Sequence, residues 1–97
     1  MIIIIDRKAE EYIKSKSTDN SIHIAAQLVG RGWCRHYEPS VQMGKPTQEN
    51  AFDLYEVGDI KVYVLKWLRS RNNEIRITLN NFFFIKHLNA DGITFLT

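Results

Sequence analysis

Cysteine is almost absent from this sequence of 97 residues, which contains Cys34 and no other. A single cysteine cannot form a disulfide within the chain, and it cannot build a zinc site from several thiolates. One small hydrophobic core therefore has to hold the fold, and we expect a single domain over residues 1–97.

Long hydrophobic runs are absent as well. The opening segment Met1–Ile5 is followed at once by Asp6 and Arg7, so it is shorter than the apolar region of about 7–15 residues in a signal peptide. No segment reaches the roughly 20 apolar residues of a transmembrane helix. We interpret the opening segment as a strand and expect a cytoplasmic protein with no membrane association.

A strong excess of charge of one sign is also missing, because 13 Lys and Arg stand against 11 Asp and Glu, a net charge of +2. The basic residues between 61 and 86 lie around Tyr63 and Trp67, which is the composition of a weak nucleic-acid surface. They alternate with core residues, however, as on any solvated strand face. We therefore do not expect a nucleic-acid partner.

The pattern of apolar residues predicts many short strands and one helix. Ala9, Tyr12 and Ile13 share one stripe of a helix over 7–16, and Asp6 is placed to cap it. The pair Gly58-Asp59 predicts a hairpin with a two-residue type II′ turn. The expected strands cover 2–5, 22–29, a short segment at Val41–Met43, 52–57, 60–65, 75–79 with its continuation through 82–85, and 93–96.

These elements predict a mainly β, α+β fold. Six or seven short strands with one N-terminal helix favour an antiparallel sandwich or partial barrel, because links of a few residues cannot make parallel crossovers. The run Phe82–Phe84 cannot lie on one side of a strand, since consecutive residues point to opposite faces. Core packing on one side and a subunit contact on the other would explain it, and we therefore expect a homodimer.

Cys34 is the leading candidate for chemistry. It follows Gly30 and Gly32, and its neighbours Arg35 and His36 resemble the surroundings of reactive cysteines. It could equally be a small buried hydrophobic residue beside Trp33. The two interpretations differ in the exposure of the thiol.

His36 is the candidate partner of Cys34. On a strand, residues two apart share one side, so Cys34 and His36 could contact one metal ion, although stable sites need three or four ligands. We expect His23 and His87 to be structural or surface residues. A thiol hydrolase with His36 as base and Glu38 as its orienting group is disfavoured, because about 6–7 Å separates such positions along a strand. We therefore assign no catalytic residue and expect a protein that is not an enzyme.

The order of elements, the cysteine that follows two glycines and the block Glu38–Pro46 resemble the HesB/IscA-like domain of A-type iron-sulfur cluster biogenesis proteins. More narrowly, the sequence resembles a short divergent branch of CC/Se-motif proteins, which carries adjacent Cys-Cys or Cys-selenocysteine. The segments that fit this branch best are 52–64, 74–79 and 82–88.

This resemblance implies a mainly β fold and the binding of iron or an iron-sulfur cluster by a cysteine of the central loop and a C-terminal Cys-Gly-Cys. Cys34 matches the first cysteine, residues 91–97 contain none, and Arg35 stands where the second half of the pair would be. A cluster shared across a dimer would have two thiolates of about four, so His36 or external thiols would have to complete it.

Three functions therefore stay open. The first is a protein of iron-sulfur cluster assembly that works with other assembly proteins, with Cys34 as ligand and His36 as helper. The second is a degenerate domain that serves as a protein interaction module, with Cys34 buried and no metal. The third is a single-thiol redox protein, which would form disulfides only with other molecules.

Overall fold

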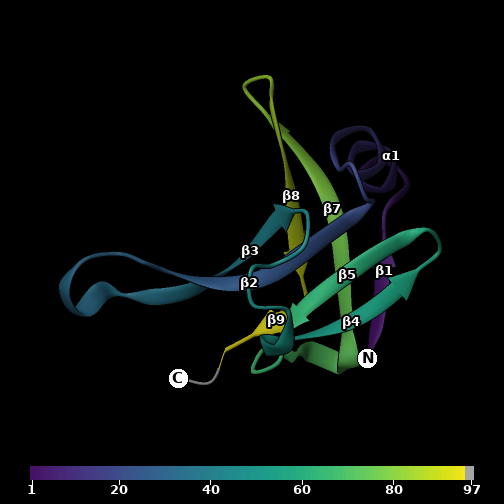
Figure 1. The fold of residues 1–97 in the computed structure, drawn as a ribbon. Coiled ribbons are helices and arrows are strands. Elements are labelled where there is room, and N and C mark those ends of the chain that lie inside the picture. Colours follow the sequence, from purple (N-terminus) through teal and green to yellow (C-terminus); the bar gives the residue numbers. More distant parts are fainter. Residues whose placement is uncertain (96–97) are drawn as a thin grey trace.

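The alternating apolar residues form nine strands within residues 1–95, the part of the chain that the computed structural model describes. One α-helix and three short 3₁₀ helices accompany them (Figure 1). The elements, in chain order, are β1 (Ile2–Ile5), α1 (Arg7–Lys16), β2 (Ser21–Val29), η1 (Gly32–Cys34), β3 (His36–Met43), η2 (Glu49–Ala51), β4 (Phe52–Val57), β5 (Ile60–Leu65), β6 (Arg69–Ser70), η3 (Arg71–Asn73), β7 (Glu74–Phe82), β8 (Ile85–Asp91) and β9 (Ile93–Thr94).

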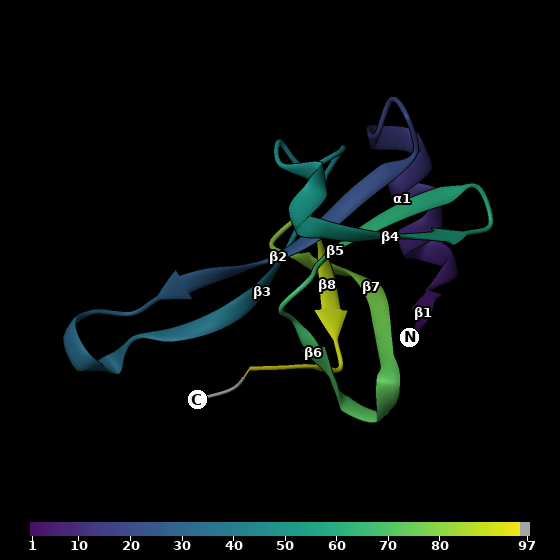
Figure 2. The same ribbon diagram turned by 60° about the horizontal axis from the view of Figure 1, so that its bottom comes forward.

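The strands form three sheets, and the mainly β, α+β prediction is confirmed. Their orders are β1-β7-β8, β3-β2-β5-β4 and the small pair β6-β9. Among residues 1–95 no sheet closes into a barrel. Figure 2 shows the β7–β8 hairpin and the four-stranded sheet from a second side.

The helix forms where the sequence predicts it. The Asp6 carboxylate accepts a hydrogen bond from the Arg7 backbone N–H at 2.9 Å, which satisfies one of the open donors of the first turn. Ala9 and Ile13, one turn apart, are buried. This helix is not long or apolar enough to cross a membrane, and the described part of the chain has no other α-helix.

The core is built largely from isoleucines of several strands that meet α1. Its central members are fully buried, and partly buried residues of the sheet edges surround them. The buried apolar residues are Ile3, Ala9, Ile13, Ile22, Ile24, Ile60, Val62, Val64, Leu68, Ile75, Ile77, Leu88 and Ala90.

Three pairs of consecutive strands form antiparallel hairpins, β2–β3, β4–β5 and β7–β8. The predicted hairpin is β4–β5, in which Val57 pairs with Ile60 across the turn Gly58-Asp59. Two other pairs are parallel, which the antiparallel prediction did not include: β1 lies beside β7 and β2 beside β5. The physical reason is sequence distance. A short link fixes the direction of the next strand, whereas strands separated by other elements can meet in either direction.

Strand β3 is longer than the short segment predicted at Val41–Met43, because it begins at His36. Pro39 lies inside it opposite Ala26. Proline has no N–H for a strand ladder, but β3 is an edge strand that is hydrogen-bonded only to β2, so one side needs no donor. Pro39 is therefore compatible with its place inside this strand.

The sequence predicted that the run Phe82–Ile85 continues the preceding strand, and this prediction was wrong. The chain reverses at Phe83 and Phe84, so that Phe82 ends β7 and Ile85 begins β8 in direct pairing. All four side chains are exposed, so the predicted core role of the phenylalanines was wrong. The last predicted strand is observed as Ile93–Thr94, and Leu96 lies outside the described residues.

Candidate functional site

The β2–β3 hairpin carries Cys34 away from the body of the molecule (Figure 1). Strand β5 pairs with β2 only from Ser21 to Ile24, whereas β3 pairs with β2 as far as Val29. Residues 25–40 therefore form a projecting ribbon of two strands, which we call the arm. Cys34 lies in η1 at its tip.

Two glycines allow the sharp turn at the tip of the arm. Gly30 and Gly32 have φ angles of 102° and 60°, a region that L side chains rarely adopt. A Cβ atom on Gly30 would collide with the carbonyl oxygen of Cys34, whereas one on Gly32 would meet open space. The Cys34 backbone N–H donates to the Arg31 carbonyl at 3.0 Å and closes the turn. Glycine is thus required at position 30, because the backbone of Cys34 packs too closely against it for a side chain.

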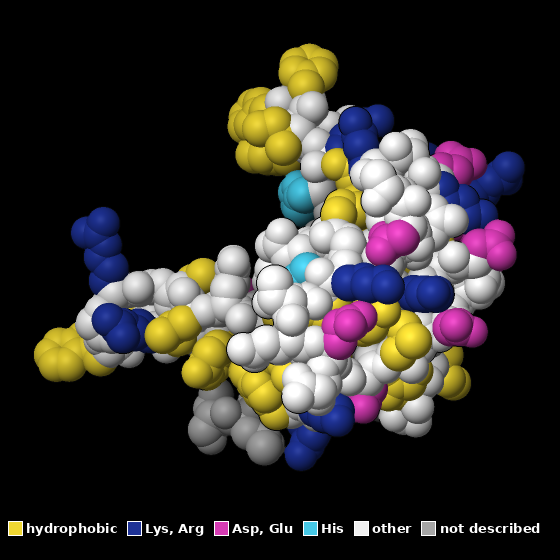
Figure 3. Space-filling model, viewed as in Figure 1, with side chains coloured by type: hydrophobic (Ala, Val, Ile, Leu, Met, Phe, Trp, Pro, Cys, Tyr) yellow, Lys and Arg dark blue, Asp and Glu magenta, His cyan; other side chains and the backbone are white. Residues whose placement is uncertain are grey.

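The side chains at this tip are exposed to solvent. Cys34 is exposed, which contradicts the interpretation of a small buried hydrophobic residue. Trp33 is 99% exposed, and Arg31 and Arg35 are exposed on either side of it. Figure 3 shows hydrophobic and basic side chains together at the end of the arm. The tip therefore offers one accessible thiol beside a large aromatic ring and two positive charges.

The sequence predicted that His36 and Cys34 share one face of a strand. They do not, because Cys34 belongs to η1 and His36 begins β3. The His36 Nε2 atom lies 3.1 Å from the Glu38 carboxylate, and both side chains are exposed. The two residues thus touch despite the strand spacing that argued against contact. Since the Nε2 atom of His36 contacts Glu38, the other ring nitrogen, Nδ1, is the one left to bind an external ligand.

The other histidines lie elsewhere and agree with the predicted structural or surface roles. His23 is partly buried, its Nδ1 atom lies 2.9 Å from the accepting carbonyl of Gly44, and its ring meets Phe52 edge-on. His87 is exposed on β8 opposite Asn80. Within residues 1–95 no three side chains of His, Cys, Asp or Glu come together to hold a metal ion. The described part of one chain therefore does not provide a complete metal site.

An aromatic cluster beside the arm was not predicted. The rings of Tyr37 and Trp67 have centroids 5.5 Å apart, and Phe95 lies 5.9 Å from Tyr37 and 6.2 Å from Trp67. Such pairs stabilise beyond their buried area. The three residues are far apart in the sequence, so no local pattern reveals the cluster. Tyr37 pairs with Leu28 in the outer part of the arm, so the cluster joins the arm to the segments around Trp67 and Phe95.

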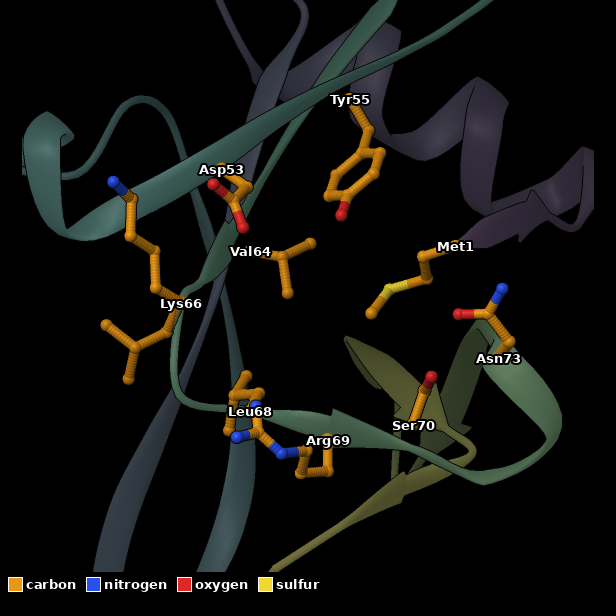
Figure 4. Close-up of a pocket in the computed structure, with 10 residues that line it drawn as sticks. Met1, Asp53, Tyr55, Val64, Lys66, Leu68, Arg69, Ser70 and Asn73 are labelled. Carbon is orange, nitrogen blue, oxygen red and sulfur yellow. The ribbon is translucent and has the colours of Figure 1, made fainter.

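A hollow of about 350 Å³ lies away from the arm, between the strand pair β4–β5 and the segment that carries β6. Figure 4 shows Asp53, Tyr55, Lys66, Arg69 and Ser70 among the residues that line it. A nucleophilic site would need a base beside a serine or cysteine. Ser70 lines this hollow, but in residues 1–95 its hydroxyl forms no hydrogen bond to Asp53 or Lys66, and no histidine or cysteine is present. The hollow is therefore a weaker candidate than the arm tip.

Comparison with known protein families adds to this geometry. The model of the CC/Se motif containing family matches residues 1–93. The chain belongs to this family. No curated protein and no solved structure matches the sequence.

Membership of the CC/Se motif containing family gives Cys34 a context. The pair that the resemblance implies for these proteins, Cys-Cys or Cys-selenocysteine, would fall at positions 34 and 35. Arg35 occupies the second position. On this implied placement, Cys34 corresponds to one thiol of the pair and the guanidinium group of Arg35 stands in place of the other.

Proposed function

We propose that this protein is a non-enzymatic, HesB/IscA-like protein of the cytoplasm that contributes one thiol, Cys34, to iron-sulfur cluster assembly at a contact with another chain. The observation that carries the proposal is the exposed position of Cys34 at the tip of a projecting arm. The iron-sulfur context comes from the resemblance of the sequence to A-type biogenesis proteins, and the chain belongs to the CC/Se motif containing family. Thiolates are the ligands that these clusters require.

The arm suits a contact between chains better than a resident cluster. Cys34 is the single thiol of the chain, and the described residues hold no complete ligand set. Iron or a cluster is therefore cargo in this proposal, and the remaining ligands come from a second copy or from another assembly protein. A thiol on a narrow tip can enter a partner's site, whereas a buried one cannot.

The test is anaerobic purification of the wild type and the Cys34→Ser variant, before and after incubation with ferrous iron and sulfide. Iron content, sulfide content and visible absorption are measured for both. The His36→Asn variant serves as the matched control, because His36 lies near the tip but is oriented toward Glu38. We expect metal and colour in the wild type, their loss in Cys34→Ser and at most a partial decrease in His36→Asn. Equal metal content in wild type and Cys34→Ser would contradict the proposal.

The second candidate is an interaction module that binds a partner protein without metal. The observation that favours it is Trp33, which is 99% exposed between Arg31 and Arg35. Tryptophan and arginine are the side chains most enriched among residues that dominate protein interfaces. Unlike in the sequence-based version of this candidate, Cys34 is exposed in the structure, so the thiol can serve as a reporter of the contact.

These candidates give different results in the same preparation. A colourless, metal-free wild type with a rapidly labelled Cys34 favours the interaction module. A single-thiol redox protein would instead carry a mixed disulfide on Cys34 after aerobic purification, because the chain has no second cysteine to resolve it. Mass spectrometry of the intact protein with and without reductant detects that adduct.

A further inference from the structure

The β7–β8 hairpin ends in four large apolar side chains that face solvent. Phe82, Phe83, Phe84 and Ile85 are 66%, 79%, 99% and 68% exposed. Figure 3 shows a hydrophobic group at the top of the molecule, at the end of this hairpin. Scattered exposed apolar residues are ordinary on protein surfaces, but a contiguous group marks a contact site.

The backbone of this turn gives a second, independent observation. Phe83 and Phe84 have φ angles of 50° and 65°, in the left-handed region that bulky residues avoid. Two-residue hairpin turns of this kind favour Asn-Gly, which would adopt them at lower cost. The chain uses Gly58-Asp59 for another hairpin turn. The phenylalanines are therefore held at the β7–β8 turn against the preference of the backbone, as at functional sites.

The same hairpin borders a hollow of about 530 Å³, on the side that faces α1. Tyr12 of α1 and Leu79 of β7 give it partly buried, apolar walls. Lys8 and Lys86 lie at its edge, and in residues 1–95 neither forms an ion pair. The Tyr12 hydroxyl reaches the Lys86 carbonyl at 3.4 Å and joins the helix to the hairpin. Glu11, Ser15 and Asn81 complete the lining. The Tyr12 ring, Leu79 and the two lysines suit an aromatic side chain through packing and cation–π contact.

We propose that the hollow receives the aromatic tip of a second copy of this chain. The hollow includes Asn81 and Lys86, which precede and follow the four apolar residues and thus lie within about 10 Å of the turn along the strands. Two hairpins that run antiparallel around a two-fold axis place each tip in the hollow of the other. The two contacts are related by the same two-fold axis, so the assembly stops at a dimer and does not extend into a chain.

A lipid surface is the less suitable occupant. Anionic lipids attract proteins through clusters of several basic residues. Here Lys8 and Lys86 share the hollow with Glu11, whose charge is also offset by Arg7 at 3.6 Å, and the whole chain carries only +2. The hollow contains the Tyr12 ring and can contact the phenylalanines of the tip directly, whereas a bilayer has no such defined binding site.

The proposed pairing does not rest on the function of Cys34. The arm and the β7–β8 hairpin project in different directions (Figure 1). Cys34→Ser should therefore leave self-association unchanged, and the tip variants should leave metal content unchanged. Failure of either proposal is thus visible without reference to the other.

Analytical ultracentrifugation over a wide concentration range tests the pairing. The tip variant Phe83→Asn/Phe84→Gly has the residues that this turn prefers, so a loss of dimer cannot be attributed to unfolding. Ser15→Arg places a long charged side chain in the hollow from an exposed helix position. We expect a dimer for the wild type and a dissociation constant raised at least about tenfold in each variant. Trp33→Ser, which removes an equally exposed ring from the arm, should dimerise like the wild type.

Mixing the two variants sharpens the test. A heterodimer of the tip variant and Ser15→Arg keeps one intact tip–hollow contact, so the mixture should associate more tightly than either variant alone. A wild type that stays monomeric at all concentrations would overturn the proposal, and so would a dimer that the tip variant does not weaken. Sedimentation of monomeric wild type with phosphatidylserine vesicles, lost in the tip variant, would assign the tip to a lipid surface instead.

Discussion

Two hairpins leave the body of this molecule, and their turns are built in opposite ways. The arm turns through Gly30 and Gly32, where the backbone conformation excludes other residues or makes them costly. The β7–β8 hairpin turns through Phe83 and Phe84, where the backbone would accept smaller residues more readily. At the arm, the backbone determines the residues. At the β7–β8 turn, the side chains are kept despite the backbone, which indicates that the rings themselves are needed.

The largest effect is expected at Gly30. Gly30→Ala introduces a Cβ atom that collides with the Cys34 carbonyl and imposes an unfavourable φ angle. The conformation alone costs about 1–3 kcal/mol, and the collision adds to this. We expect faster amide hydrogen exchange throughout the arm and a lower urea midpoint. Gly32→Ala is the control, because its Cβ meets open space, and its cost should be limited to about 1–2 kcal/mol. Equal effects of the two substitutions would contradict the structure of the tip.

The second prediction has the opposite sign. Phe83→Asn/Phe84→Gly should raise the free energy of unfolding of the monomer by about 1–2 kcal/mol, because it removes two bulky residues from left-handed conformations. Urea unfolding at a concentration where both proteins are monomeric measures this gain. A loss of stability would show that the rings stabilise the monomer itself, and it would remove the contrast between the two hairpins.

A third prediction concerns the start of β2, at the end of this strand that is opposite the arm, where Ser17, Asp19 and Ser21 form a hydrogen-bonded turn. The hydroxyl groups of Ser21 and Ser17 donate to the Asp19 carboxylate at 2.5 Å and 3.0 Å, and they lower its pKa. Because the folded pKa lies below the unfolded value of about 3.9, this contribution is fully present above that value and is lost as the pH falls through the folded pKa.

Thermal unfolding between about pH 7 and about pH 3 checks the role of Asp19. The stability of Asp19→Asn should fall less between neutral and acidic pH than the stability of the wild type, because the variant has no carboxylate at this position to be protonated. Glu56→Gln is the matched control, since Glu56 is exposed and forms no hydrogen bond or ion pair with its side chain in the described part of the chain. Identical pH profiles for wild type and Asp19→Asn would exclude the network as a source of stability.

The smallest effect is expected for the thiol. Since Cys34 is exposed, its rate of labelling in the native protein should agree within about threefold with the rate in urea. A much slower native reaction would mean that the thiol is covered in solution, by a second copy or by a change in the arm. Labelling of the Gly30→Ala variant should be no slower, because a loosened tip exposes the thiol further.

Local sequence patterns predicted the elements whose partners lie nearby. The helix from Arg7 to Lys16 and the hairpin around Gly58-Asp59 depend on contacts within a few residues, so apolar spacing and turn chemistry were sufficient. Predictions failed where a distant neighbour decides. Pro39 fits into β3 because that strand is at an edge of its sheet, and the position of a strand in a sheet is not a local property.

The candidate site was predicted only in part. The two glycines and the single cysteine marked this stretch, because glycine allows the backbone to turn sharply and the chain has one thiol. The sequence left open whether the thiol is buried, and it placed His36 on the same side as Cys34. Exposure of the thiol depends on how far β5 extends along β2. The pairing of these two strands ends at Ile24, so β5 does not reach the tip of the hairpin. The phenylalanines misled for a related reason, since nothing in a run of four apolar residues indicates a turn inside it.

The sequence by itself determined a small mainly β protein with one capped helix, a core of isoleucines and a lone cysteine in a glycine-containing loop. These features follow from hydrophobic periodicity and from the backbone limits of single residues. Only the tertiary structure decided that Cys34 and Trp33 stand on a projecting arm, that Phe82–Ile85 form an exposed tip and that a hollow lies beside that tip. The physical reason is that burial is settled by which strands pair across long sequence distances, and local patterns do not carry that information.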